Sequence, residues 1–322
     1  NTVADALDAF TTFRAKVPAD KLTLFHARFA LRDRLRTEMK ILDLFGQHST
    51  PGQRRGQLVM ATQVVEQSLD ADWDVIVSDL APIDRLIQRA GRLQRHPRDP
   101  QGGRLLDSAA RDQRGEAHLY VYGPEWAELP PANWFKAAFP KVANVYAHHG
   151  QLWLTAKALQ KGHFAMPSDA RALIEGVFGE GAEMPGALQH NADQAEGKAY
   201  GDAGEAQQNT VKLVSGYVRA GIDWWSEAKT PSRLGEASVN VVLARWELGR
   251  YVPWCEHENP RHAWAYSTVR VAERLIAKTA EPDDPARKAA LEAVLLTLPG
   301  KGAWVVLLPL EQVNGVWVGQ AC

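Results

Sequence analysis

Four short apolar segments, each bounded by helical or turn-forming residues, dominate the first 125 residues. They cover residues 21–27, 56–62, 73–79 and 116–123, and helices are expected between them at 2–16, 31–45 and 83–93. Parallel strands need long crossover connections, which are usually helices. The alternation therefore predicts an α/β unit over residues 1–125, with a parallel sheet and helices on both of its faces.

The sequence opens directly on a predicted helix, with Asn1 or Thr2 as a plausible N-cap and acidic residues in the first turns. No strand precedes this helix, although a sheet of this kind would normally begin with one. We therefore interpret the first strand, and everything before it, as missing from the sequence.

Three further stretches differ in composition from the alternating strands and helices. Residues 96–115 are rich in Pro, Gly and charge and predict an exposed loop, whereas 126–210 predict a helical connector. Within the connector, 133–180 are expected to be helical, most clearly at 145–159, and 181–209 form either a linker or an acid-rich helix. Residues 211–322 predict an α+β accessory domain, with hairpins at 238–254 and 302–319 and a helix at 285–296. The second hairpin carries an Asn-Gly turn.

Composition excludes several classes of protein. The net charge is −1, so a nucleic-acid surface would have to be a local patch. The two cysteines, Cys255 and Cys322, form no CxxC pair, which excludes a disulfide framework and a Cys-rich zinc site and suits the cytoplasm. No apolar run approaches the roughly 20 residues that span a bilayer.

The stretch QRAGRLQRH, residues 88–96, concentrates arginines at helical spacing. On a helix, Arg89 and Arg92 project from one face, and Gly91 lets a ligand or another backbone approach closely. Two guanidinium groups side by side suit a triphosphate, because each can fork to phosphate oxygens and stays charged. The alternative is a solvated basic helix face.

The stretch ATQVVEQSLD, residues 61–70, follows a predicted strand, so Thr62 and Gln63 lie at the carboxyl end of a sheet strand. A Thr hydroxyl and nearby backbone N–H groups can hold a nucleic-acid phosphate. Asp70 suits a ribose hydroxyl, although it could equally cap a turn. His26 and Arg28 lie between a strand and a helix, where a phosphate could meet the helix N-terminus, unless His26 is a packing residue.

In order and wording, these stretches resemble motifs V and VI of superfamily-two helicases, with Gln88, Arg89, Gly91, Arg92 and Arg95 matching motif VI. Together with residues 1–6, 24–34 and 230–236, they resemble the CRISPR-associated helicase-nuclease of type I systems, in its type I-E-like branch. Only the C-terminal portion of that family is represented.

The resemblance implies a second RecA-like helicase lobe followed by an α+β domain. It also implies ATP with Mg²⁺, held mainly by a first lobe outside this sequence. Arg92 would be the arginine finger, Arg89 its partner on the phosphates, Gln88 a phosphate-positioning residue and Asp70 a ribose contact. Thr62, Gln63, His26 and Arg28 would contact DNA. The implied partners are single-stranded DNA, the RNA-guided complex Cascade, the first RecA-like lobe and an HD nuclease domain.

The sequence contains no GxxxxGK[ST] loop, no DExH box and no HD constellation; PGKGAW at 299–304 reads as a turn. AHHG (147–150) and CEHEN (255–259) offer too few ligands for a metal. The C-terminal tryptophans are read as core residues, and Arg233 as a candidate phosphate contact. We therefore expect the intact protein to be an ATP-dependent helicase with a nuclease domain elsewhere, and this chain alone to be inactive. The alternatives are a stand-alone DNA- or Cascade-binding lobe that acts in trans, or another superfamily-two helicase.

Overall fold

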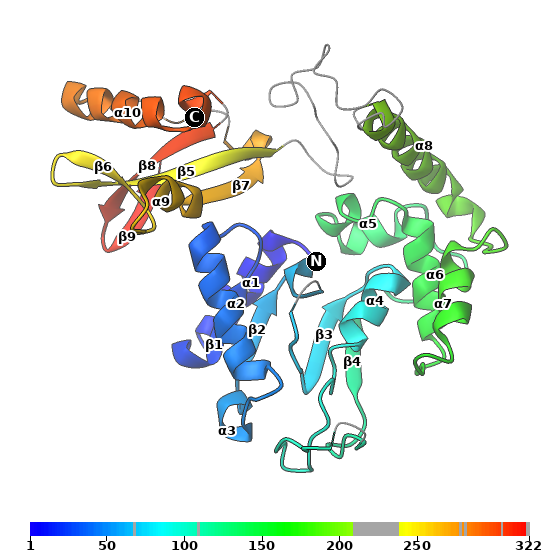
Figure 1. Ribbon diagram of the computed structural model, residues 1–322. Coiled ribbons are helices and arrows are strands. Elements are labelled where there is room, and N and C mark those ends of the chain that lie inside the picture. The colour runs from blue at the N-terminus through cyan, green and yellow to red at the C-terminus, as the bar shows by residue number, and fades with distance from the viewer. Residues whose placement is uncertain are drawn as a thin grey trace, which may run out of the picture. The chain divides into compact units, whose positions relative to one another are not determined.

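The computed structural model describes residues 1–66, 69–107, 110–208, 238–276, 279, 282–303 and 305–319 (Figure 1). The predicted features around Arg233, and tryptophans 224, 225 and 304, lie outside these ranges. The chain forms two compact units, each built from separate stretches of sequence. Unit 1 comprises residues 1–2, 73–95 and the described part of 116–235. Unit 2 comprises 3–72, 96–115 and the described part of 236–322. The predicted domain boundaries at 125 and 210 stay predictions.

Unit 2 begins with a pair of parallel strands and the helices around them. Strand β1 (Leu22–Phe25) pairs with β2 (Leu58–Ala61). Helix α1 (Val3–Arg14) contacts both strands, and α2 (Leu31–Phe45) contacts β1. Helix α3 (Pro51–Arg54) opens with a capping box, in which Thr50 accepts from the Gln53 N–H while the Gln53 side chain accepts from Thr50.

Unit 2 also contains a five-stranded mixed sheet. Strand β5 (Ser238–Glu247) pairs antiparallel with β6 (Arg250–Pro253) and β7 (Thr268–Ala272), and parallel with β8 (Val305–Val313). Strand β9 (Val316–Gly319) completes the sheet through a hairpin with β8. The predicted Asn-Gly turn is confirmed, since Asn314 and Gly315 have φ angles of 51° and 79°.

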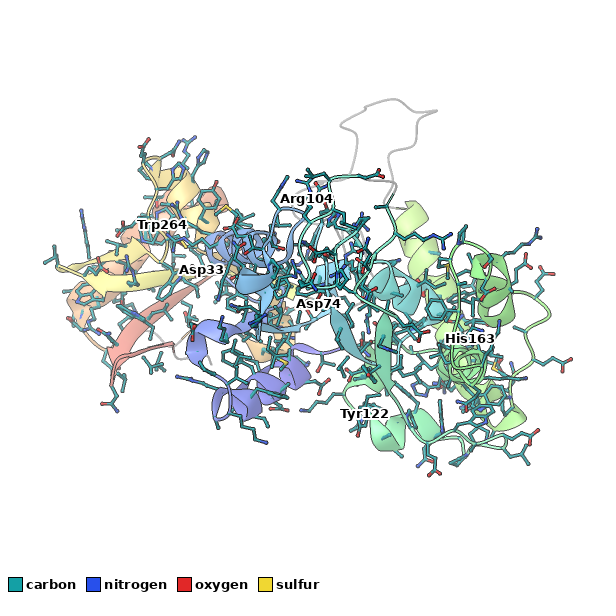
Figure 2. All side chains as sticks on the ribbon, turned by 90° about the horizontal axis from the view of Figure 1, so that it is seen from below. Asp33, Asp74, Arg104, Tyr122, His163 and Trp264 are labelled. Carbon is teal, nitrogen blue, oxygen red and sulfur yellow. The ribbon has the colours of Figure 1, made fainter. Side chains whose placement is uncertain are left out.

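Helices cover this sheet on both faces. On one face, Val242 and Ala244 of β5 pack with Leu291 of α10 (Pro285–Thr297), which Figure 1 shows lying along the strands. On the other face, Val269 clusters with Cys255 and with Ala30, the residue before α2. Helix α9 (Pro260–Tyr266) precedes β7. Figure 2 labels Asp33 of α2, whose carboxylate accepts a 2.7 Å hydrogen bond from the Trp254 indole.

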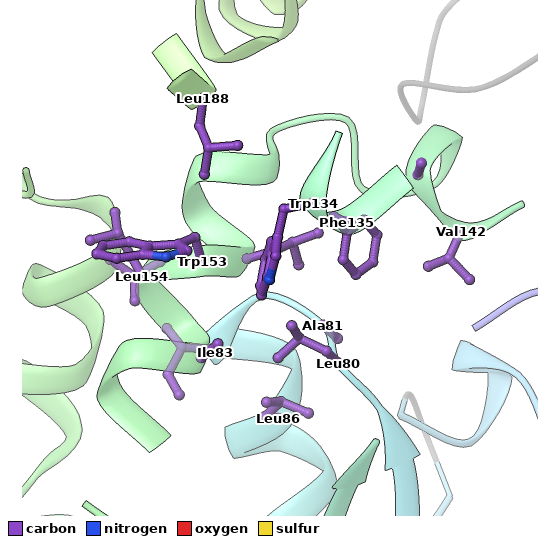
Figure 3. Packing of buried hydrophobic residues seen from close by; sticks show 14 residues of the cluster. Leu80, Ala81, Ile83, Leu86, Trp134, Phe135, Val142, Trp153, Leu154 and Leu188 are labelled. Atoms are coloured by element: carbon purple, nitrogen blue, oxygen red, sulfur yellow. The ribbon is translucent and has the colours of Figure 1, made fainter. Parts of the chain in front are cut away.

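Unit 1 is a second parallel strand pair with a helical cover. Strand β3 (Val75–Asp79) pairs with β4 (His118–Tyr122), and α4 (Ile83–Ala90) follows β3. The remaining helices are α5 (Trp134–Ala138), α6 (His149–Leu159), α7 (Ala170–Phe178) and α8 (Gly186–Gln208). Their core is shown in Figure 3, where Leu80, Ile83 and Leu86 lie among Trp134, Phe135, Trp153 and Leu188.

The predicted fold class is confirmed: parallel strands with helices are followed by a mixed sheet with helices. Residues 186–208 resolve the open choice for 181–209 in favour of a helix. Two expectations need correction. Helix α4 ends at Ala90 instead of 93, because Gly91 closes it and Leu93 bridges to Trp73. The segment 96–115 is irregular but not simply exposed, because Arg98 is fully buried. Among the described residues, none of the helices combines the length and the hydropathy needed to cross a membrane.

Candidate nucleotide and nucleic-acid sites

The arginine-rich segment after β3 is held by backbone hydrogen bonds within unit 1. The Arg92 N–H donates to the Arg89 carbonyl (3.0 Å), and the Arg92 carbonyl accepts from the Trp73 N–H (2.9 Å). The Gln94 N–H then donates to the Trp73 carbonyl (2.9 Å), and Leu93 is buried. Arg92 is therefore fixed beside the start of β3, just beyond the end of the helix.

The side chains around this turn lie at the surface of unit 1. Gln88 is exposed, Arg92 is half-buried, and the Arg92 guanidinium donates to the Gln88 carbonyl (3.1 Å). Arg95 is exposed and donates to the Gly91 carbonyl (3.2 Å). The structure thus brings Gln88 and Arg92 together. However, it does not place Arg89 and Arg92 on one face of a continuous helix, because the helix ends between them.

Arg89 has different surroundings. Its guanidinium donates to the Ser78 hydroxyl (2.5 Å), the Asp79 carbonyl (3.3 Å), the Asn1 side-chain oxygen (2.9 Å) and the Tyr146 hydroxyl (3.3 Å). Neither Ser78 nor Tyr146 was predicted to belong to a site. Their sequence context, the end of a strand and a helical connector, carries no signal for that role.

The predicted DNA contacts meet at one edge of the β1–β2 pair in unit 2. Phe25 of β1 is in register with Ala61 of β2, and the Thr62 N–H donates to the Phe25 carbonyl (3.2 Å). His26 and Thr62 therefore lie at the same carboxyl edge of the two parallel strands. Gln63 follows there, at the start of a 3₁₀ turn that ends at Glu66.

His26 is a packed side chain in this structure. It is 5% exposed, its ring stacks on Phe29 at 4.3 Å, and its Nδ1 accepts from the Arg28 N–H (3.1 Å). Burial lowers the pKa of His26, and the Arg28 charge lowers it further. The imidazole is therefore neutral at neutral pH. Arg28 itself is exposed and supplies an accessible cation at this edge, whereas Thr62 is buried.

Asp70, the predicted ribose contact, is exposed in unit 2, and its carboxylate lies 3.1 Å from His96 Nε2. The residues predicted from the first motif, Thr62 to Asp70, thus belong to unit 2. The residues predicted from the second, Gln88 to Arg92, belong to unit 1.

A buried ionic network in unit 2 was not predicted. Arg98 and Asp72 are both fully buried and form an ion pair of 2.5 Å. Arg114 pairs with Asp72 (3.0 Å) and with Asp112 (2.7 Å). The Arg114 contact holds the pKa of Asp112 below its usual range, despite the opposing effect of burial. The sequence signal was weak, because an arginine in a Pro-rich loop is normally exposed.

One histidine of AHHG and the cysteine of CEHEN are buried. His149 is buried with Nε2 3.3 Å from the Ala143 carbonyl, and burial lowers its pKa. Cys255 is buried, which raises its thiol pKa. Among the described residues, no group of three His, Cys, Asp or Glu side chains is placed to hold a metal ion. Cys322 lies outside the described ranges.

The fold is consistent with a RecA-like lobe followed by an α+β domain. Comparison with known proteins shows which proteins this chain is similar to. Residues 1–98 match the family model described as CRISPR-associated nuclease/helicase Cas3, C-terminal. This match covers 98 of the 322 residues, and the chain resembles the C-terminal portion of CRISPR-associated Cas3 proteins. Its subtype stays a prediction.

Similar curated proteins carry the same family name. The chain is 33% identical over 196 residues to the endonuclease/helicase Cas3 of Thermus thermophilus, covering 60% of this chain and 19% of the relative. It is 49% identical over 78 residues to the Cas3 of Escherichia coli K12, covering 24% of this chain and 8% of the relative. The chain therefore spans less than a fifth of the length of these relatives.

Solved structures share the fold over nearly the whole chain. The T. fusca Cas3–AMPPNP crystal structure superposes with a TM-score of 0.68 at 23% identity, covering 99% of this chain and 36% of the other. A structure described as a CRISPR RNA-guided surveillance complex, pre-nicking, superposes with a TM-score of 0.61 at 23% identity. The match covers 98% of this chain and 38% of the other.

Proposed function

We propose that this chain supplies the second-lobe half of an ATP-driven single-stranded-DNA translocase, within a helicase-nuclease that unwinds and degrades foreign DNA. The observation that carries this proposal is the fixed position of Arg92, held by hydrogen bonds to Arg89 and Trp73 just after α4. The Arg92 guanidinium also donates to the Gln88 carbonyl (3.1 Å). A charged donor held in place stabilises charge in a transition state with little reorganisation.

The donor set at this turn fits a nucleotide phosphate. Gln88, Arg92 and Arg95 all carry N–H donors within one short segment, and arginine forks match phosphate oxygens. When bound, ATP with Mg²⁺ would supply the phosphoanhydride whose cleavage drives the motor. Arg92 would stabilise charge on the transferring phosphoryl group, and Gln88 would orient the phosphates. Separately, Asp70 of unit 2 would accept a hydrogen bond from a ribose hydroxyl. We propose that Mg²⁺ is held mainly by residues outside this chain.

The edge formed by β1 and β2 would hold the DNA backbone. Arg28 is exposed there and would contact a phosphate, while Thr62 and Gln63 lie on the neighbouring strand end. Phosphate contacts give affinity without sequence preference, which suits a translocase that must move along any strand. The neutral, buried His26 would shape this edge without adding charge.

The proposed partners are single-stranded DNA and an RNA-guided surveillance complex of the Cascade type. The second partner is supported by the fold shared with a structure described as such a complex. The nuclease activity is proposed to reside in an HD domain that this sequence does not contain.

The test is ATP turnover with single-stranded DNA by the full polypeptide that contains this chain, in the presence of its Mg²⁺. Arg92→Ala should lower kcat by about 10³-fold or more, the usual worth of an arginine finger. Arg111→Ala, an exposed arginine of the 96–115 loop, should leave kcat unchanged. The isolated chain should show no turnover above background. Robust turnover by the isolated chain, or full activity of Arg92→Ala, would contradict the proposal.

A further inference from the structure

The acceptors around Arg89 come from three separate segments of unit 1. Ser78 and Asp79 end β3, Asn1 lies against the same strand end, and Tyr146 precedes α6. Each terminal nitrogen of a guanidinium carries two N–H groups. The four contacts therefore account for four of the five N–H donors of Arg89.

The acceptors are themselves fixed by other contacts. The Ser78 hydroxyl is buried and donates to the Asp79 carbonyl (2.7 Å), so it can accept from Arg89 at the same time. The Asn1 amide donates to the Leu80 carbonyl (2.9 Å). Tyr146 packs against the main core of unit 1. The guanidinium of Arg89 thus lies in a rigid cradle.

A short path connects this cradle to Arg92. Arg89 is the second-last residue of α4, and its carbonyl accepts the Arg92 N–H (3.0 Å). A displacement of Arg89 would therefore displace the residue that is proposed to reach the phosphate.

We infer that Arg89 is a positioning residue, held by Ser78 and Tyr146 so that it sets the place of Arg92, and that it is not itself a phosphate ligand. This inference rests on the function proposed above, and it reassigns the role that the sequence suggested for Arg89. A phosphate could engage the Arg89 fork only by displacing hydrogen bonds from this cradle.

The experiment measures DNA-stimulated ATP hydrolysis by the full polypeptide that contains this chain. Ser78→Ala and Tyr146→Phe each remove a hydroxyl from the cradle, and each should lower kcat by about tenfold, as expected for bonds to a charged group. The KM for ATP should stay within about twofold, because neither residue touches the nucleotide. Ser168→Ala and Tyr200→Phe remove exposed hydroxyls elsewhere in unit 1 and should change neither value.

The decisive measurement is a double-mutant cycle with Arg92→Lys, which keeps a cation but loses the fork. Because Ser78 acts through Arg92, Ser78→Ala should lower kcat little further in the Arg92→Lys background. Ser78→Thr, which keeps the hydroxyl, should retain the parent kcat. Ser78→Ala should shift the thermal unfolding midpoint equally in the parent protein and in Arg92→Lys. A loss of kcat that differs between these two proteins is then an effect on positioning and not on folding.

Three results would overturn the inference. If the effects of Ser78→Ala and Arg92→Lys multiply, the cradle acts on stability alone. If Ser78→Ala leaves kcat unchanged while Arg89→Lys lowers it, Arg89 contacts the phosphate directly. If Arg92→Lys retains the parent kcat, the proposed function fails, and the positioning role fails with it; only this last result bears on the function itself.

Discussion

Arg98→Ala tests whether the buried ionic network holds the 96–115 segment in unit 2. Arg98 is fully buried, and its Nε donates to the Asp72 carboxylate at 2.5 Å. Its terminal nitrogens donate to the Ser49 carbonyl (2.9 Å) and the Gly46 carbonyl (3.0 Å). The substitution removes the cation and leaves all three acceptors in place.

The expected cost follows from the partners that remain. Breaking a buried ion pair from one side costs about 3–5 kcal/mol, because the other charge is left uncompensated. Asp72 keeps Arg114 at 3.0 Å, so we expect the lower end, about 3 kcal/mol in the free energy of unfolding. Arg111→Ala, in the same segment but exposed, should change this free energy by less than about 0.5 kcal/mol.

The assay is urea unfolding followed by far-UV circular dichroism, with amide hydrogen exchange over residues 96–115. The Arg98→Ala midpoint should fall without a large change in slope, and exchange in the segment should accelerate. An unfolding free energy within about 1 kcal/mol of the parent would refute the reasoning, since a carboxylate buried beside one remaining cation could not be so well tolerated.

Three further changes test other parts of the structure. In salt titrations of single-stranded-DNA binding, Arg28→Ala should reduce the slope of log affinity against log salt by about 0.7. His26→Gln should leave that slope unchanged, because His26 is neutral; equal losses would contradict this. The lowered pKa of His149 means that the unfolded chain binds a proton which the folded chain resists. Stability should therefore decline as pH falls below about 6.5, and His149→Gln should make the decline shallower in pH-dependent unfolding. Finally, Gly46→Ala brings a Cβ to 2.4 Å from the Leu42 carbonyl and should cost about 1–3 kcal/mol, whereas Gly52→Ala, with open space around it, should not; thermal melts of both variants decide this.

Local pattern was sufficient to predict the strands and most helices. The α2 boundaries agree with the expected 31–45, and β1 to β4 all fall inside their predicted segments. These elements depend on residues a few positions apart, so periodicity and turn chemistry report on them directly. The end of α4 was missed because a bridge to Trp73, far from the helix in sequence, competes with continued helix.

The candidate sites could be predicted only where a local pattern or a general rule of the fold places their residues. Thr62 and His26 meet because parallel strands align their carboxyl ends, a rule that sequence order already contains. Arg98 and Tyr146 could not be found in this way. Their partners lie 26 and 57 positions away, and only the folded chain shows that these polar side chains are paired.

The contact of α2 with the C-terminal sheet has a consequence for synthesis of the chain. Asp33 of α2 and its partner Trp254 are 221 residues apart. At a translation rate of about 5–20 residues per second, Asp33 is synthesised roughly 10–40 s before Trp254. Ala30, the residue before α2, packs with Cys255, which is synthesised after a similar interval. Until then this apolar surface on the nascent chain is available to chaperones, and a ribosome that stalls in between leaves it uncovered.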